Sequence, residues 1–131
     1  MINFESDYTE GCIPEILEAL VSTNNEQTTG YGMDYHCEHA ADLIRSAFDC
    51  KDADVHFMVG GTQANLTVIA SILKPYQGVL CAESGHINVH ETGAVEATGH
   101  KCLYLPSQDG TITAEQVEKA YLLHESDESF E

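Results

Sequence analysis

The sequence predicts an α/β fold in which helices flank a mainly parallel sheet. Short apolar runs at 55–59, 79–82 and 101–105 have the length of strands, and helical patterns separate them. A strand, helix, strand order implies parallel pairing, and here that order repeats. The chain has 131 residues, 43% of them hydrophobic, which suits one domain with a core.

Residues 1–50 are predicted to form a helical segment that precedes the sheet. Pro14 suits the first turn of a helix. The apolar residues of this first helix share one face by their spacing: Ile16, Leu17, Leu20 and Val21. A polar loop at 22–32 follows. A second helix is indicated by a further apolar set: Ala40, Ala41, Leu43, Ile44, Ala47 and Phe48.

Residues 51–131 are predicted to form the start of the sheet. The expected elements are, in order, a strand at 55–59, a helix at 62–73, a strand at 79–82, a helix at about 88–98, a strand at 101–105 and a helix from 113. Ile112 is a candidate for one further short strand. The run Thr113-Ala114-Glu115-Gln116 resembles a capping box, which would open the last helix.

Charge and composition narrow the classes of partner. The formal net charge is -17, from 22 acidic and 5 basic residues, which disfavours binding to nucleic acid or to an anionic membrane. No run is long enough to span a membrane, and the first residues lack an export pattern, so we expect a cytoplasmic protein. The five cysteines are scattered and odd in number, which favours reduced thiols.

A glycine turn between the first predicted strand and its helix is the first candidate site. Gly60 and Gly61 lack Cβ atoms, and Thr62 carries a hydroxyl at the helix start. Backbone N–H groups at such a start can bind a phosphate. The spacing fits neither the nucleotide P-loop nor the dinucleotide fingerprint, whose third glycine is replaced by Asn65. Close packing of helix on strand is the alternative interpretation.

His86 follows the next predicted strand at its carboxyl end, the edge where ligands gather in such sheets. Its imidazole could stack on a ligand or move protons, or it could simply hydrogen-bond to backbone. Glu91 could orient that imidazole or lie on a solvated face. His36, Cys37 and His39 lack the spacing of a zinc site, so we predict no metal.

Four ordered blocks together resemble the threonine aldolase family. They are Ser6-Asp7-Tyr8-Thr9, Tyr31-Gly32-Met33-Asp34, Gly60-Gly61-Thr62-Gln63-Ala64-Asn65, and His86 with Glu91. Members of this family are pyridoxal-phosphate (PLP) enzymes of the aspartate-aminotransferase-like fold (fold type I), grouped with the β-eliminating lyases. The resemblance covers essentially all 131 residues and implies the N-terminal part of the large domain.

The resemblance also implies roles for individual residues. Gly61 and Thr62 would hold the cofactor phosphate, and His86 would stack on the pyridine ring as the catalytic histidine. Ser6 would contact the substrate carboxylate, and Tyr31 would bind substrate near a subunit boundary in a homo-oligomer, a dimer or tetramer. The family usually has serine or threonine where Gly60 stands, so one hydroxyl donor is absent here.

The implied reaction is cleavage of a β-hydroxy-α-amino acid, L-threonine or L-allo-threonine, to glycine and acetaldehyde. The family places its cofactor-binding lysine, and the acid that pairs with the pyridine nitrogen, beyond residue 131. The chain has lysines that do not fit that place: Lys51, Lys74, Lys101 and Lys119. We therefore expect a truncated chain that is inactive alone. The alternatives are a related PLP-dependent β-eliminating lyase or transaminase, and a non-catalytic α/β fragment or assembly module.

Overall fold

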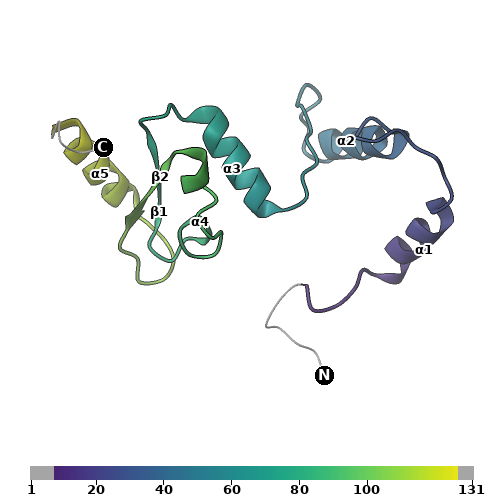
Figure 1. Cartoon of the computed structure of the whole chain (residues 1–131), viewed down its shortest axis with the longest axis horizontal. Helices are drawn as coiled ribbons and strands as arrows, with labels where there is room; N and C mark the ends of the chain where they lie inside the picture. The colour runs from purple at the N-terminus through teal and green to yellow at the C-terminus, as the bar shows by residue number, and fades with distance from the viewer. Residues whose placement is uncertain (1–7, 127–131) are drawn as a thin grey trace. The chain divides into compact units, whose positions relative to one another are not determined.

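A computed structural model describes residues 8–126 of the chain. The elements are α1 (Pro14–Thr23), α2 (Tyr35–Ala47), α3 (Gly61–Ile72), β1 (Gly78–Ala82), α4 (His86–Val89), the short 3₁₀ helix η1 (Glu96–Thr98), β2 (Lys101–Leu105) and α5 (Ala114–Ser126) (Figure 1). The chain divides into two compact units between Phe57 and Met58. Within residues 8–126, none of the helices combines the length and the apolar character that crossing a membrane requires.

The first unit contains α1 and α2, and both were predicted. Pro14 occupies the first turn of α1, as its fixed backbone angle allows. In α2 the start lies earlier than the apolar pattern suggested, because Asp34 caps the helix: its carboxylate accepts a hydrogen bond from the backbone N–H of Cys37 at 3.0 Å. Hydrogen bonds from the side chain of Cys37, and then from its backbone, hold the pKa of Asp34 below its usual value.

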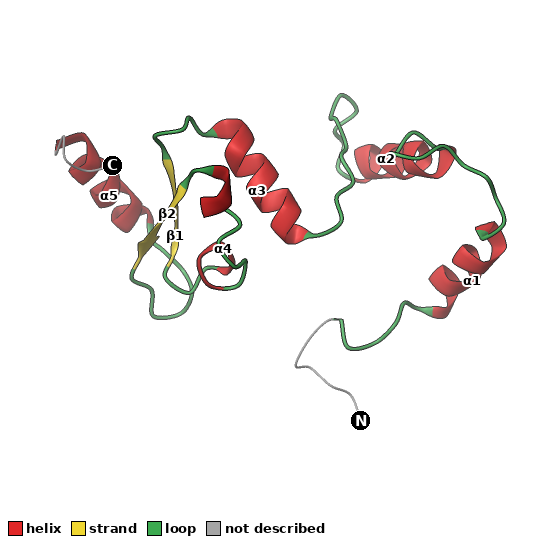
Figure 2. Ribbon diagram, in the orientation of Figure 1, coloured by secondary structure: helices red, strands yellow, loops and turns green. Residues whose placement is uncertain are grey.

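The second unit is built on two parallel strands. β1 and β2 pair from Gly78 opposite Lys101 to Ala82 opposite Leu105. One face of this pair carries a small core, with α3 and α4 contributing side chains: Cys81, Val95, Cys102, Ile69, Val79 and Ile87. Figure 2 shows α3 and α5 on opposite sides of the strands. The α/β class, with a parallel sheet and flanking helices, is confirmed.

The helix predicted from residue 113 is also confirmed, together with its capping box. The backbone N–H of Thr113 donates to Gln116 Oε1 at 2.8 Å, and the backbone N–H of Gln116 donates to Thr113 Oγ1 at 3.2 Å. Two donors at the helix start are thereby satisfied reciprocally. Ile112 forms no strand.

The predicted strand at 55–59 does not form. This segment is irregular, and within residues 8–126 the sheet contains two strands, β1 and β2. A strand needs a neighbour for its N–H and C=O groups, and apolar sequence alone does not provide one. The exposure of Phe57 (51%) and Val59 (98%) agrees with the absence of a neighbour.

The predicted helix at 88–98 is broken into α4 and η1. Between them, Thr92 and Gly93 have positive φ angles of 53° and 74°. Two consecutive left-handed residues end a right-handed helix, and glycine makes that conformation accessible at the second position. The break has a consequence for function, because Glu91 lies in the connection rather than on a helix.

The two buried thiols of the sheet should react slowly. Burial, with the nearby charge of Glu96, raises the pKa of Cys102 to about 11, and burial also raises that of Cys81. At pH 8 the reactive thiolate is then about 0.1% of Cys102, against about a quarter of a thiol with the ordinary pKa of about 8.5. We expect alkylation by iodoacetamide, followed by mass spectrometry, to modify exposed Cys12 about 100-fold faster than Cys102. Equal rates in the folded chain would contradict this, and denaturation should remove the difference.

Candidate functional site

α3 begins with backbone N–H groups that no described side chain caps. Gly60 precedes the helix in an extended conformation, and within residues 8–126 no side chain caps the first N–H groups. A Cβ atom built on Gly60 or Gly61 would meet no described atom within 4 Å. These glycines therefore do not serve close packing against a described neighbour. The first N–H groups of α3, at Gly61 and Thr62, have no side-chain cap in the described part of the chain, and an anion is favoured at such a helix start.

The approach of the chain to this turn is fixed by Gln63. Its side-chain oxygen accepts a hydrogen bond from the backbone N–H of Val59 at 3.0 Å. This contact reaches back over the helix start to the residue before the N-cap Gly60, one residue further than the N3 contact of a capping box. It holds the turn without occupying the first amides of the helix.

His86 begins α4 directly after β1. The connection is tight: Gly85 donates its N–H to the Ala82 carbonyl at 2.8 Å, and a Cβ on Gly85 would lie 2.9 Å from that oxygen. The imidazole of His86 is 65% exposed, and its Nδ1 lies 2.8 Å from Glu91 Oε1. Nδ1 of His86 therefore hydrogen-bonds to a carboxylate and not to a backbone group.

Glu91 is the buried centre of the site. Its side chain is 0% exposed. Oε1 accepts a hydrogen bond from Asn65 Nδ2 at 2.6 Å as well as from His86 Nδ1. Burial acts to raise the pKa of Glu91, but the hydrogen bonds from His86 and Asn65, and the charge that His86 carries when it is protonated, outweigh it and hold the pKa below its usual value. Glu91 is therefore a carboxylate at neutral pH.

Asn65 connects the two halves of the site, and the sequence did not indicate this. Asn65 lies four residues after Gly61 on α3, so it shares a helix face with the glycine turn. Its amide reaches Glu91, which in turn holds His86. From the sequence, Asn65 is notable for the glycine it replaces and as the last residue of the glycine-turn block, and no role of its own is predicted for it. Its helical spacing from Gly61 was the available signal.

The other predicted site residues, Ser6 and Tyr31, precede the second unit in the sequence. Ser6 is outside the described residues. Tyr31 belongs to the first unit, where it is fully exposed and has a positive φ of 66° next to Gly32. His36 Nε2 pairs with Glu26 at 2.7 Å, and the ring of His39 stacks on Tyr35.

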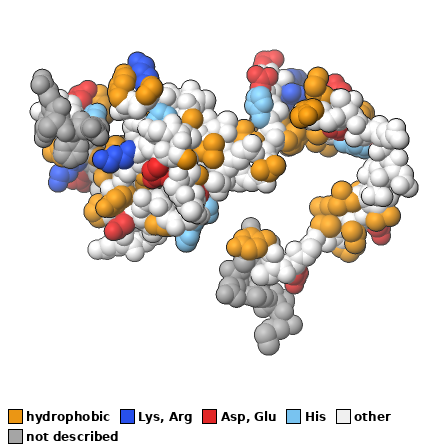
Figure 3. Space-filling view, viewed as in Figure 1, with side chains coloured by type: hydrophobic (Ala, Val, Ile, Leu, Met, Phe, Trp, Pro, Cys, Tyr) orange, Lys and Arg blue, Asp and Glu red, His pale blue; other side chains and the backbone are white. Residues whose placement is uncertain are grey.

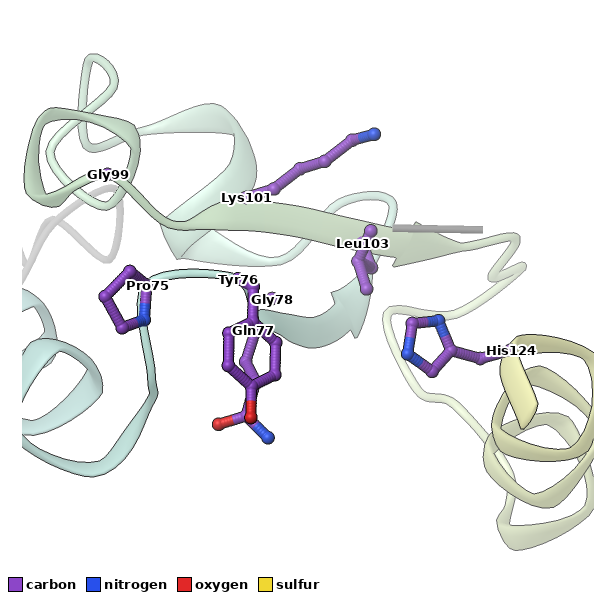
Figure 4. Close-up of a pocket in the computed structure, with 8 residues that line it drawn as sticks. All are labelled: Pro75, Tyr76, Gln77, Gly78, Gly99, Lys101, Leu103 and His124. Atoms are coloured by element: carbon purple, nitrogen blue, oxygen red, sulfur yellow. The ribbon is translucent and has the colours of Figure 1, made fainter. Parts of the chain in front are cut away.

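Two hollows lie away from the site. One of about 430 Å³ is at the amino-terminal end of the strands (Figure 4), lined by Pro75, Tyr76, Gln77, Gly78, Gly99, Lys101, Leu103 and His124. A larger one of about 720 Å³ lies between the sheet face and α5, and apolar side chains such as Leu80 and Leu105 line it. His86 lines neither hollow.

Comparisons with known proteins show which family the chain resembles in sequence. The family model described as beta-eliminating lyase matches residues 3–130. A low specificity L-threonine aldolase of Pseudomonas sp. (strain NCIMB 10558) is 33% identical over 121 residues, covering 91% of this chain and 35% of that protein. The enzyme of the same name from Pseudomonas aeruginosa is 33% identical over 112 residues, covering 84% and 32%.

The fold agrees with the sequence comparison. A solved structure of Leishmania major threonine aldolase matches with a TM-score of 0.88 and 44% identity, covering 95% of this chain and 36% of that one. The chain thus spans about a third of the length of these relatives. The predicted resemblance to threonine aldolases is confirmed. This chain belongs to the beta-eliminating lyase family.

Proposed function

We propose that this chain is the phosphate-binding part of a PLP-dependent threonine aldolase. The larger protein would cleave L-threonine or L-allo-threonine to glycine and acetaldehyde. The observation that carries the proposal is the link from the open amides of α3, through Asn65 and Glu91, to the exposed ring of His86. The names of the relatives, low specificity L-threonine aldolase, support the substrate class.

The donors present fit PLP. A phosphate dianion suits the uncapped amides of Gly61 and Thr62 with the Thr62 hydroxyl, and no described atom lies within 4 Å of a Cβ built on Gly60 or Gly61. When bound, PLP supplies the electron sink for breaking the bond between Cα and Cβ of the substrate. His86 supplies a flat ring, held at one edge by Glu91, that would lie against the cofactor.

Ser6 and Tyr31 are the proposed substrate-binding residues. Ser6 would contact the substrate carboxylate, and Tyr31 would contribute beside a subunit boundary. Homo-oligomer formation is supported by the exposed apolar side chains of α1 (Figure 3), among them Leu17 at 55% and Leu20 at 59%. A cytoplasmic location is supported by the five free cysteines.

The test is to extend the chain with the sequence that follows Glu131 in its gene. We expect this extended protein to bind PLP and to release glycine and acetaldehyde from L-threonine or L-allo-threonine, measured by a coupled assay. A stop codon directly after Glu131, or β-elimination or transamination without aldol cleavage, would contradict the proposal. The last two outcomes would favour a sister activity of the same family.

The 131-residue chain is the control for covalent cofactor binding. With PLP and borohydride, we expect mass spectrometry to find the cofactor fixed to one lysine beyond Glu131 in the extended protein and to none in the chain alone. Selective fixation on a lysine of the chain would overturn this part of the proposal; the candidates are Lys51, Lys74, Lys101 and Lys119.

A further inference from the structure

We propose that Glu91 and Asn65 are positioning residues that hold the proton of neutral His86 on Nδ1 and leave Nε2 as the open acceptor of the ring. The link of this arrangement to catalysis rests on the proposed function. The arrangement itself belongs to the 131-residue chain and can be tested there without cofactor.

The Glu91 carboxylate determines which nitrogen of His86 carries the proton. An ionised carboxylate only accepts hydrogen bonds, so the partner of Glu91 Oε1 at 2.8 Å, His86 Nδ1, must carry a hydrogen. In a neutral imidazole the other nitrogen is then an acceptor. The 65% exposure of the His86 side chain leaves the ring open to solvent.

The buried Glu91 side chain depends on the hydrogen-bond donors that reach it. Its side chain is 0% exposed, and within residues 8–126 its second oxygen, Oε2, is buried without a hydrogen-bond partner. Both described donors therefore converge on Oε1. A buried carboxylate with so few donors depends strongly on each of them, because losing one leaves charge uncompensated.

Asn65 links the Glu91 carboxylate to α3. Its amide donates to Glu91 from a position 26 residues away, on the helix whose first turn carries Gly61 and Thr62. The contact fixes the carboxylate relative to α3. The orientation of the His86 ring is consequently tied to the helix start that would hold the cofactor phosphate.

Two titratable side chains, Glu91 and His90, lie beside the ring of His86. Glu91 holds Nδ1, and the ring of His90 lies 5.4 Å away at a 49° tilt, on the same short stretch of chain. The nearby amide of Asn88 is directed elsewhere, since it donates to the Glu83 carbonyl at 2.7 Å. Asn88 therefore provides a matched control for Asn65.

The experiment is ¹⁵N NMR of the histidine rings in the chain without PLP, at a pH where His86 is neutral, with His86→Asn used to assign its signals. We expect wild-type His86 to show a protonated Nδ1 and an unprotonated Nε2. Glu91→Met keeps the shape but removes the acceptor, and should abolish this preference. Wild-type His86 with its proton on Nε2 would overturn the proposal, even if Glu91→Met does not fold.

Asn65→Ala tests the second residue. Because one hydrogen bond to the network is lost, we expect the Nδ1 proton of His86 to exchange with water about fivefold faster. Asn88→Ala should leave the exchange rate unchanged. Equal rates in wild type and Asn65→Ala would remove Asn65 from the proposal, as would equal acceleration by both variants.

These outcomes are separable from the proposed function. The expected tautomer in the chain, with no aldol cleavage by the extended protein, would retain the inference and refute the aldolase. Aldol cleavage by the extended protein, with the Nε2 proton on His86 of the chain, would do the reverse.

Discussion

Replacing Thr62 by aspartate should lower the PLP affinity of the extended protein on the order of 100-fold, because a carboxylate would face the cofactor phosphate at close range. The amides of Gly61 and Thr62 would remain, so the loss combines repulsion at the helix start with removal of the Thr62 hydroxyl. PLP fluorescence titration gives the affinity. The variant should fold normally, since an acidic residue in the first turn of a helix is favourable by about 0.3–1 kcal/mol.

Thr67→Asp is the matched control for this change. Thr67 is an exposed threonine on the same helix, so the substitution adds the same charge away from the helix start. We expect its PLP affinity to stay within about twofold of wild type. If Thr62→Asp binds PLP as tightly as Thr67→Asp, the phosphate does not lie at the start of α3.

Gly78→Ala should destabilise the second unit by about 1–3 kcal/mol, the usual cost of overpacking. A Cβ on Gly78 would lie 2.8 Å from the carbonyl oxygen of Lys101 and 2.9 Å from Leu103 Cδ1. The carbonyl belongs to the paired strand and cannot move without disturbing the ladder. Thermal unfolding followed by circular dichroism should show a midpoint lower by about 4–8 °C for each kcal/mol lost.

Gly11→Ala is the control for Gly78→Ala. A Cβ on Gly11 would meet no described atom within 4 Å, and its backbone is not in the left-handed region. We expect a change of less than about 0.5 kcal/mol. Unfolding midpoints that agree between the two variants would show that the close approach of β1 and β2 at Gly78 is not limiting.

Local signals in the sequence predicted most of the regular structure correctly. Pro14 and its apolar stripe predict α1, the run 113–116 predicts the start of α5, and the apolar runs 79–82 and 101–105 predict the paired strands. Each signal acts within a few residues, through a cap, a helix face or strand propensity. The four ordered blocks, read together, also predicted the family.

The sequence by itself therefore determined the helices with a clear start signal or apolar face, the parallel strand pair and the family. The tertiary structure decided what depends on distant partners. The segment 55–59 is apolar enough for a strand but has no described neighbour to pair with, and the turn at Thr92 and Gly93 places Glu91 off a helix. Asn65 and Glu91 are 26 positions apart in the sequence, and only the tertiary fold brings the amide to the carboxylate. A local sequence pattern does not specify which distant carboxylate a side-chain amide will bind.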